Sequence, residues 1–276
     1  MRFLSKFIET IFKLKITKLK KFNKLVNSEK NYLISLSSIE NYKNLIKNII
    51  IDNEKVDLML SNNIKSQNLQ DLVVLDLLGF KKNGIFIEAG ACDGIVNSNT
   101  YLMEKSFSWD GLLIEPIKDY FQELKNNRNV MCMNYALSSK IDNSVDFLIT
   151  DSKDLSTLKG YEDSDYHLEN RQNHKLTKVN TTTLNNLLME LSFPKDIDFL
   201  SLDTEGSELE ILNTINFEKY KIKIICVEHN FNINRENIYK FLHDKNYKRI
   251  DIPIIDIDDF YILNNFTPEN KYFVYT

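Results

Sequence analysis

The chain has 276 residues, enough for one large domain or for a domain with an appendage. Its 43% of hydrophobic and 11% of aromatic residues allow a sizeable buried core, and its few Gly and Pro residues exclude a fibrous or disordered chain. A net charge of −4 argues against general nucleic-acid binding, and three widely spaced cysteines exclude a disulfide framework or CxxC metal motif, which favours a reducing, cytoplasmic compartment.

Residues 1–70 are predicted to form a helical extension that precedes a domain over residues 71–276. Within residues 1–30, nine Lys or Arg against two Glu give a net charge of +7, which leaves −11 for the remainder. The apolar side chains of this stretch recur at helical spacing: Phe3, Leu4, Phe7, Ile8, Ile11 and Phe12. Such a basic amphipathic helix suits packing on a protein, or peripheral contact of residues 1–25 with the inner, anionic face of a membrane.

From residue 71 onward the pattern alternates between predicted strands and predicted helices. The strands are predicted over 84–88, 111–115, 130–135, 145–149, 197–203, 222–228, 247–252 and 260–263. The helices are predicted over 72–78, 99–105, 183–191, 208–215 and 236–244, with one more beginning at Pro116. Residues 151–178 are charged and have little apolar periodicity, so we interpret them as an excursion over the mouth of the sheet that selects the substrate.

This alternation predicts a mostly parallel sheet with helices on both faces, a Rossmann-like α/β fold. Ligands bind such sheets at the carboxyl ends of the strands. Four predicted strands end in an acid at this edge: Glu88, Glu115, Asp203 and Glu228. Their regular placement indicates a binding site there.

The loop after the first strand carries two spaced glycines in the pattern Glu88-x-Gly90-x-x-x-Gly94. A glycine just past a strand lets the backbone turn sharply and approach a ligand closely. The tighter three-glycine dinucleotide fingerprint is absent, so no phosphate cradle is expected. Glu115 lies 21 residues beyond Gly94, where an acid accepts hydrogen bonds from the ribose hydroxyls of an adenosine ligand. Alternatively, Glu115 stabilises the N-terminus of the helix at Pro116.

With other stretches in the same order, these residues resemble the FkbM family of methyltransferases. The matching stretches are 87–94, 98–100, 109–116, 134–138, 156–158, 197–208 and 227–230. The most specific of them is Asp203-Thr204-Glu205-Gly206-x-Glu208. The resemblance covers residues 80–250 and implies a class I methyltransferase fold and methyl transfer from S-adenosylmethionine, typically to a hydroxyl of a sugar or secondary metabolite.

We therefore expect S-adenosylmethionine to lie against the glycine loop, with its ribose at Glu115. The predicted cofactor-binding residues are Glu88, Gly90, Ala91, Asp93, Gly94, Asn99, Glu115, Pro116, Ser138 and Asp203. Ser138, or Asp142 further on, is the candidate for contact with the adenine. Asn99 is expected to order the loop, to reach the cofactor carboxylate or to cap its helix.

Methylation of a hydroxyl requires an aligned acceptor oxygen and a base that takes its proton. The predicted catalytic residues are His229, Asp203 and Glu205, and His229 is the preferred base because its unperturbed pKa lies near neutrality. The alternative for His229 is a loop-holding role beside a carboxylate, and Asp203 could instead hold the amino group of the cofactor. The spacing requires no metal, although Asp203, Glu228 and Asn230 are candidate oxygen ligands for Mg²⁺.

The sequence thus predicts a cytoplasmic O-methyltransferase with a glycan or small-molecule acceptor and no nucleic-acid partner, and it leaves the oligomeric state open. Within the excursion, Arg171 suits an anionic acceptor. One alternative is an NAD-dependent oxidoreductase, which the glycine spacing disfavours. The other is a non-catalytic, cofactor-binding adaptor that the basic helix brings to the membrane surface.

Overall fold

The computed structural model describes residues 63–164, 167–231, 234–252, 255, 257–268 and 274–275. These residues belong to one compact unit that begins at Asn63. The predicted basic helix and its proposed membrane contact lie outside the described residues. Within the described ranges, no helix has the length and apolar character that a membrane crossing needs.

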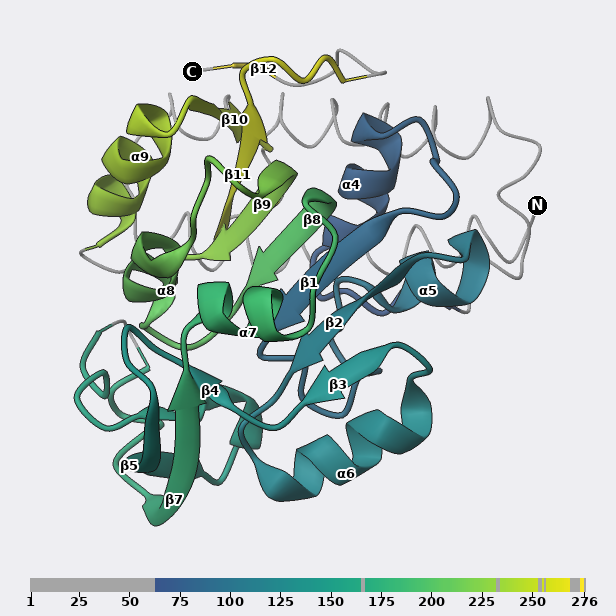
Figure 1. Ribbon diagram of the computed structural model, residues 1–276. Coiled ribbons are helices and arrows are strands. Elements are labelled where there is room, and N and C mark those ends of the chain that lie inside the picture. The colour runs from purple at the N-terminus through teal and green to yellow at the C-terminus, as the bar shows by residue number, and fades with distance from the viewer. Residues whose placement is uncertain are drawn as a thin grey trace, which may run out of the picture. The chain divides into compact units, whose positions relative to one another are not determined.

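An eight-stranded, mostly parallel sheet organises this unit, in the order β12-β10-β11-β9-β8-β1-β2-β3 (Figure 1). Its parallel central strands are β1 (Ile85–Ala89), β2 (Asp110–Ile114), β3 (Met131–Met133), β8 (Asp196–Leu202) and β9 (Lys221–Glu228). At one edge, β11 (Asp258–Leu263) runs antiparallel to β9 and to β10 (Tyr247–Asp251), and β12 (Val274–Tyr275) pairs with β10. The predicted fold class is confirmed, because the apolar runs form strands that are buried along nearly their whole length.

Helices cover both faces of this sheet. The helices before and between the first three strands are α4 (Gln70–Leu77), α5 (Tyr101–Phe107) and α6 (Lys118–Asn127). Those around β8 and β9 are α7 (Leu184–Glu190), α8 (Glu208–Thr214) and α9 (Arg235–Asp244). Helix α4 contacts α5, whereas α8 contacts α7 and α9, and right-handed crossovers place these two groups on opposite faces. The larger core lies between the sheet and α7–α9, with Leu188, Leu200 and Leu212 fully buried.

A second sheet of four strands, ordered β4-β7-β5-β6, stands beyond the carboxyl ends of the central strands (Figure 1). Its strands are β4 (Ala136–Leu137), β5 (Asp142–Thr150), β6 (Thr157–Leu158) and β7 (His174–Thr182). The stretch 151–178, predicted as an excursion over the mouth of the sheet, contains the short 3₁₀ helix η1 (Lys153–Leu155), β6 and the first half of β7, and its role in selecting the substrate stays a prediction. The outer half of β7 is mostly exposed, so no apolar alternation marks it in the sequence.

Candidate active site

The loop after β1 turns at Gly90, whose φ of +81° lies in the left-handed region. Its N–H donates to the Ile114 carbonyl over 3.0 Å, which holds the loop against the end of β2. A Cβ at this position would overlap the carbonyl oxygen of Asp203, at the end of β8. Only glycine therefore allows the loop to pass this close to the neighbouring strand, and the sharp turn agrees with the prediction from the sequence.

Glu115 lies directly against this loop and is 2% exposed. Its Oε2 accepts a hydrogen bond of 2.9 Å from the Cys92 N–H, and its Oε1 accepts one of 2.6 Å from the Ile117 N–H. Burial raises the pKa of this carboxyl to about 7. Each oxygen keeps a further lone pair for a ligand hydroxyl. The proximity of Glu115 to the glycine loop is confirmed, and its bond just before α6 agrees with the capping alternative as well.

A cleft that is partly open to solvent lies between the carboxyl ends of the central strands and the second sheet. One wall is apolar and includes Ile117, Phe147 and Leu158. The other wall carries acids, among them Glu115, Asp203 and Glu205. The cleft therefore offers an apolar surface opposite a row of hydrogen-bond acceptors.

Four of the predicted cofactor-binding residues line this cleft: Gly90, Glu115, Pro116 and Asp203. The other six do not line it: Glu88, Ala91, Asp93, Gly94, Asn99 and Ser138. Glu88 is buried and accepts hydrogen bonds from the Ser98 and Thr100 hydroxyls and from the Asn99 N–H. Its carboxylate thus organises the loop that follows β1.

The remaining predicted residues also act on the shape of the loop or of its surroundings. Asp93 Oδ1 accepts from the N–H groups of Ile95 and Val96, which closes a turn. Asn99 donates from Nδ2 to the Ser201 hydroxyl over 3.0 Å, while its buried Oδ1 has no hydrogen-bond partner among the described residues. The Ser138 N–H donates to the carbonyl of Thr182 and so joins β4 to β7. Direct cofactor contact by these residues stays a prediction.

Arg128, which was not predicted from the sequence, holds the loop after β1 through several hydrogen bonds. Its side chain is fully buried, and Nε lies 2.5 Å from Glu104 Oε2. Nη1 donates to the Gly94 carbonyl and the Ser98 hydroxyl, both at 3.0 Å, and Nη2 donates to the Thr100 hydroxyl. A single arginine after a polar helix has no local signature, so only the folded structure reveals this role.

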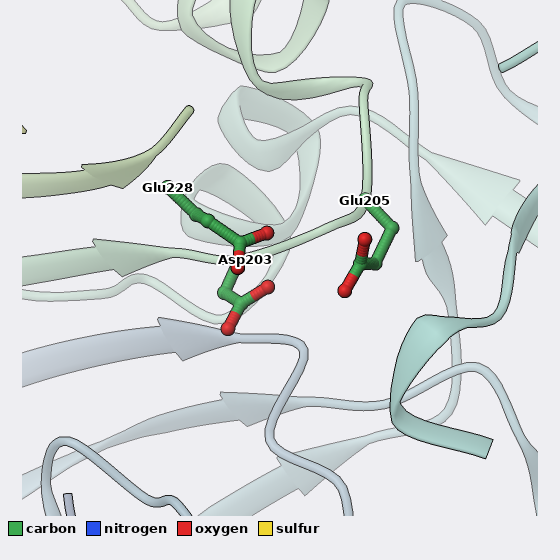
Figure 2. Close-up of side chains that lie close together, drawn as sticks. All are labelled: Asp203, Glu205 and Glu228. Atoms are coloured by element: carbon green, nitrogen blue, oxygen red, sulfur yellow. The ribbon is translucent and has the colours of Figure 1, made fainter. Parts of the chain in front are cut away.

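Three carboxyl groups meet where β8 and β9 end (Figure 2). Their oxygens, from Asp203, Glu205 and Glu228, all lie within 4.8 Å of one another. Asp203 and Glu228 share a hydrogen bond. Burial raises the pKa of Asp203 to about 7. Burial and the charge of Asp203 together hold the pKa of Glu228 well above its usual range. The raised pKa values of both groups favour a proton that is shared between the two carboxyl groups.

The turn that carries Asp203 and Glu205 is fixed by Glu208, the first residue of α8. Its Oε1 accepts hydrogen bonds from the Thr204 N–H, the Thr204 hydroxyl and the Gly206 N–H, at 2.9, 2.9 and 3.1 Å. Acceptance by a carboxylate at a helix start satisfies backbone donors and favours the positive end of the dipole. This network explains why the specific motif of the sequence ends in Glu208.

His229 lies apart from the cleft, although it directly follows Glu228. It is 3% exposed, its Nδ1 accepts from the Phe231 N–H at 3.0 Å, and its Nε2 lies 3.7 Å from Asp259 Oδ1. These contacts fit the loop-holding alternative, and the role of His229 as a base stays a prediction. Asn230 is also buried, and its side chain makes no hydrogen bond within the described ranges.

Two further expectations change with this geometry. Arg171 was suggested for an anionic acceptor, yet its side chain is fully buried and bonded to Glu205, so that expectation was wrong. Among the metal candidates, Asp203 and Glu228 do come together, but the third member of their cluster is Glu205 and not Asn230. Binding of Mg²⁺ there stays a prediction.

The glycine loop after β1, the acid after β2 and the parallel order β3-β2-β1-β8-β9, continued by the antiparallel strand β11, define a class I methyltransferase fold. The chain belongs to the FkbM methyltransferase family, because the family model described as "Methyltransferase FkbM domain" matches residues 88–267. By family it is thus an S-adenosylmethionine-dependent methyltransferase.

Solved structures similar to the chain include three methyltransferases at low identity. A precorrin-6y C5,15-methyltransferase from Geobacter metallireducens GS-15 is 12% identical, with 76% of this chain and 93% of that chain covered and a TM-score of 0.37. A SAM-dependent methyltransferase from Aquifex aeolicus is 11% identical, with coverages of 74% and 95% and a TM-score of 0.36. The plantazolicin methyltransferase BpumL, in complex with SAH, is 10% identical, with coverages of 93% and 98% and a TM-score of 0.33. No curated protein sequence matches the chain.

Proposed function

We propose that this protein is an O-methyltransferase that methylates a hydroxyl of a sugar, a glycan or a related metabolite. The observation that carries the proposal is the position of Asp203. Its carboxylate lines the cleft beside Gly90 and is hydrogen-bonded to the buried Glu228. A proton acceptor beside the glycine loop is what a hydroxyl acceptor needs, because the oxygen loses its proton as it gains the methyl group.

The cleft residues fit the cofactor that the family uses. S-adenosylmethionine, when bound, supplies the methyl group from its sulfonium. Glu115 would accept hydrogen bonds from the ribose hydroxyls, and the absence of a side chain at Gly90 leaves room beside the backbone. Ile117, Phe147 and Leu158 would form the apolar wall against the adenine, in place of the predicted Ser138 or Asp142, which do not line the cleft.

Asp203 is a better candidate for the base than His229, because Asp203 lines the cleft and His229 does not. Glu228 would keep the Asp203 carboxylate oriented by donating a hydrogen bond to it. Proton transfer to a positioned base contributes about 10²- to 10⁴-fold in rate. Glu205, on the same acidic wall, would orient the acceptor hydroxyl.

The polar lining of the cleft supports a polyhydroxylated acceptor. It includes Lys153, Asp154, Ser156 and Ser207, which present both donors and acceptors of hydrogen bonds. A sugar presents the same mixture of donors and acceptors on every ring position. The resemblance to enzymes that methylate sugars and secondary metabolites points the same way.

Titration calorimetry with S-adenosylhomocysteine and with NAD tests the cofactor assignment, and we expect binding of the first only. Mass spectrometry of glycans and small metabolites from a strain that lacks the gene then identifies the acceptor, as a product that has lost one CH₂ unit. With that acceptor, Asp203→Asn should lower kcat by at least about 10²-fold, and His229→Gln should change it much less. Retained cofactor binding without turnover on any acceptor would instead favour the non-catalytic adaptor.

A further inference from the structure

Two walls of the cleft come from distant parts of the sequence and meet at one buried arginine. The first wall is the turn after β8 that contains Glu205. The second is the segment 153–158, of which Lys153, Asp154, Ser156 and Leu158 line the cleft. Arg171 lines neither wall, and its side chain is fully buried behind both.

The guanidinium of Arg171 bonds both walls at once. Nη2 lies 2.5 Å from Glu205 Oε2. Nε donates to the Leu155 carbonyl over 3.0 Å, and Nη1 donates to the Glu162 carbonyl over 3.3 Å. A planar guanidinium presents these donors in a fixed fork, which a lysine cannot reproduce.

The same two segments also contact each other directly. The Thr157 hydroxyl donates to the Glu205 carbonyl over 2.8 Å. Glu205 itself has a φ of +58°, in the left-handed region that residues other than glycine seldom adopt. A Cβ on the next residue, Gly206, would overlap the side chain of Ser164. Thr157 of the second segment and Ser164 beyond it therefore both lie against the turn that carries Glu205.

The charge of Arg171 also determines where the Glu205 carboxylate can rest. Glu205 is 5% exposed and lies beside Asp203 and Glu228, two further carboxyl groups. A buried carboxylate in such company requires a positive partner, because desolvation and like charges both oppose its ionisation. Arg171 supplies that charge from the side away from the cleft, which leaves the acidic wall open to a ligand.

We propose that Arg171 is a positioning residue: through Glu205 and the Leu155 carbonyl it sets the two walls of the cofactor cleft in one fixed arrangement. The inference rests on the proposed function for the nature of the ligand, but the coupling between the walls does not depend on any ligand. Removing the arginine frees the Glu205 turn and segment 153–158 together. A shift of about 1 Å in such a wall is enough to cost about 10²-fold in a well-oriented site.

The test compares Arg171→Met and Arg171→Lys with the control Asp198→Asn. Asp198 is a buried acid at the opposite end of β8, bonded to Lys81 and Lys223 at 2.7 Å each, so it tests loss of an ion pair away from the cleft. Hydrogen–deuterium exchange of the ligand-free protein reports the backbone of residues 153–158 and 203–207. Titration calorimetry with S-adenosylhomocysteine reports the cleft.

We expect exchange in both segments to rise together in Arg171→Met, and affinity for S-adenosylhomocysteine to fall by about 10- to 100-fold. Arg171→Lys should restore part of the affinity, and Asp198→Asn should leave it unchanged. If Arg171→Met does not fold, the double variant Arg171→Met/Glu205→Gln removes the unpaired charge, and it should fold yet still bind weakly. A folded variant without the arginine that binds as the wild type does, or exchange that rises in one segment only, overturns the proposal. Failure of the wild type to bind S-adenosylhomocysteine would defeat the proposed function, while the exchange data would still decide the role of Arg171.

Discussion

Replacement of Gly90 by alanine is the most direct perturbation of the contact between the glycine loop and the acidic wall. The new Cβ would overlap the Asp203 carbonyl oxygen, which is backbone and cannot rotate away. Relief requires β1 to separate from β8, and these strands are paired from Phe86 to Ala89. The substitution therefore strains the place where Asp203, the proposed base, follows β8.

Gly160→Ala provides a matched control for the size of the effect. Gly160 has a φ of +105°, and a Cβ there would meet nothing within 4 Å. Both substitutions carry the strain of a positive φ, about 1–3 kcal/mol. Gly90→Ala adds overpacking against fixed backbone, about 1–3 kcal/mol more. We expect a total loss of about 2–6 kcal/mol for Gly90→Ala, against about 1–3 kcal/mol for the control.

Urea unfolding measures the stability term, and titration calorimetry with S-adenosylhomocysteine measures the site. We expect Gly160→Ala to bind as the wild type does, and Gly90→Ala to bind about 10²-fold more weakly because the loop and Asp203 are displaced. The reasoning is refuted if Gly90→Ala is no less stable than Gly160→Ala and keeps wild-type affinity. That result would mean that the loop does not press against the end of β8.

Three further predictions use the same two measurements. Glu115→Gln should weaken S-adenosylhomocysteine binding about 10- to 100-fold, because charge-assisted hydrogen bonds to ribose contribute about 1.5–3 kcal/mol each. The control Asp119→Asn changes a 78% exposed acid on α6 and should leave the affinity unchanged. Equal losses of affinity in the two variants would contradict the role of Glu115. Burial raises the pKa of Asp203 from 3.8 to about 7, so the folded protein binds more protons than the unfolded chain in this window, and its stability should fall as pH rises through it. Unfolding at pH 5 and pH 8 should therefore show Asp203→Asn gaining stability relative to the wild type at the higher pH, and a constant difference would count against the raised pKa. Arg128→Met should destabilise the protein by about 3–5 kcal/mol, because it removes the buried guanidinium that bonds Glu104 Oε2, the Gly94 carbonyl and the Ser98 and Thr100 hydroxyls. Arg235→Met, whose arginine is 37% exposed beside Asp259, should cost less, and a similar loss in urea unfolding would contradict the role of Arg128 in holding the loop.

The main sheet and one half of the site could be predicted because their signals are local. Each central strand is a continuous apolar run that ends in a polar residue, and such runs mark parallel strands whichever partners they find. The position of Glu115 beside the glycine loop follows from one βαβ unit, in which the loop and the acid end adjacent strands. The acids of β8 and β9 likewise meet because neighbouring parallel strands end at the same edge.

The second sheet could not be predicted, because it depends on pairing between segments that are distant in the sequence. Strand β7 has mostly exposed residues over 174–178 and gains its place only by pairing with β5. The direction of the His229 side chain likewise could not be predicted from its place in the sequence. A residue at a strand end can point along the loop or into the cleft, and the Phe231 N–H and Asp259 hold this ring away from the cleft.

Two buried arginines outside the sequence motifs hold the carboxylates of two motif residues in place. The motif residues Glu88 and Glu205 are both carboxylates with almost no exposure, and neither could keep its place in a low-dielectric interior without donors around it. Arg128 and its hydroxyl partners Ser98 and Thr100 surround Glu88. Arg171 plays the same part for Glu205 from the other side of the cleft. The motifs of this protein thus supply the acids of the loop and of the acidic wall, while arginines outside those motifs determine where these acids lie.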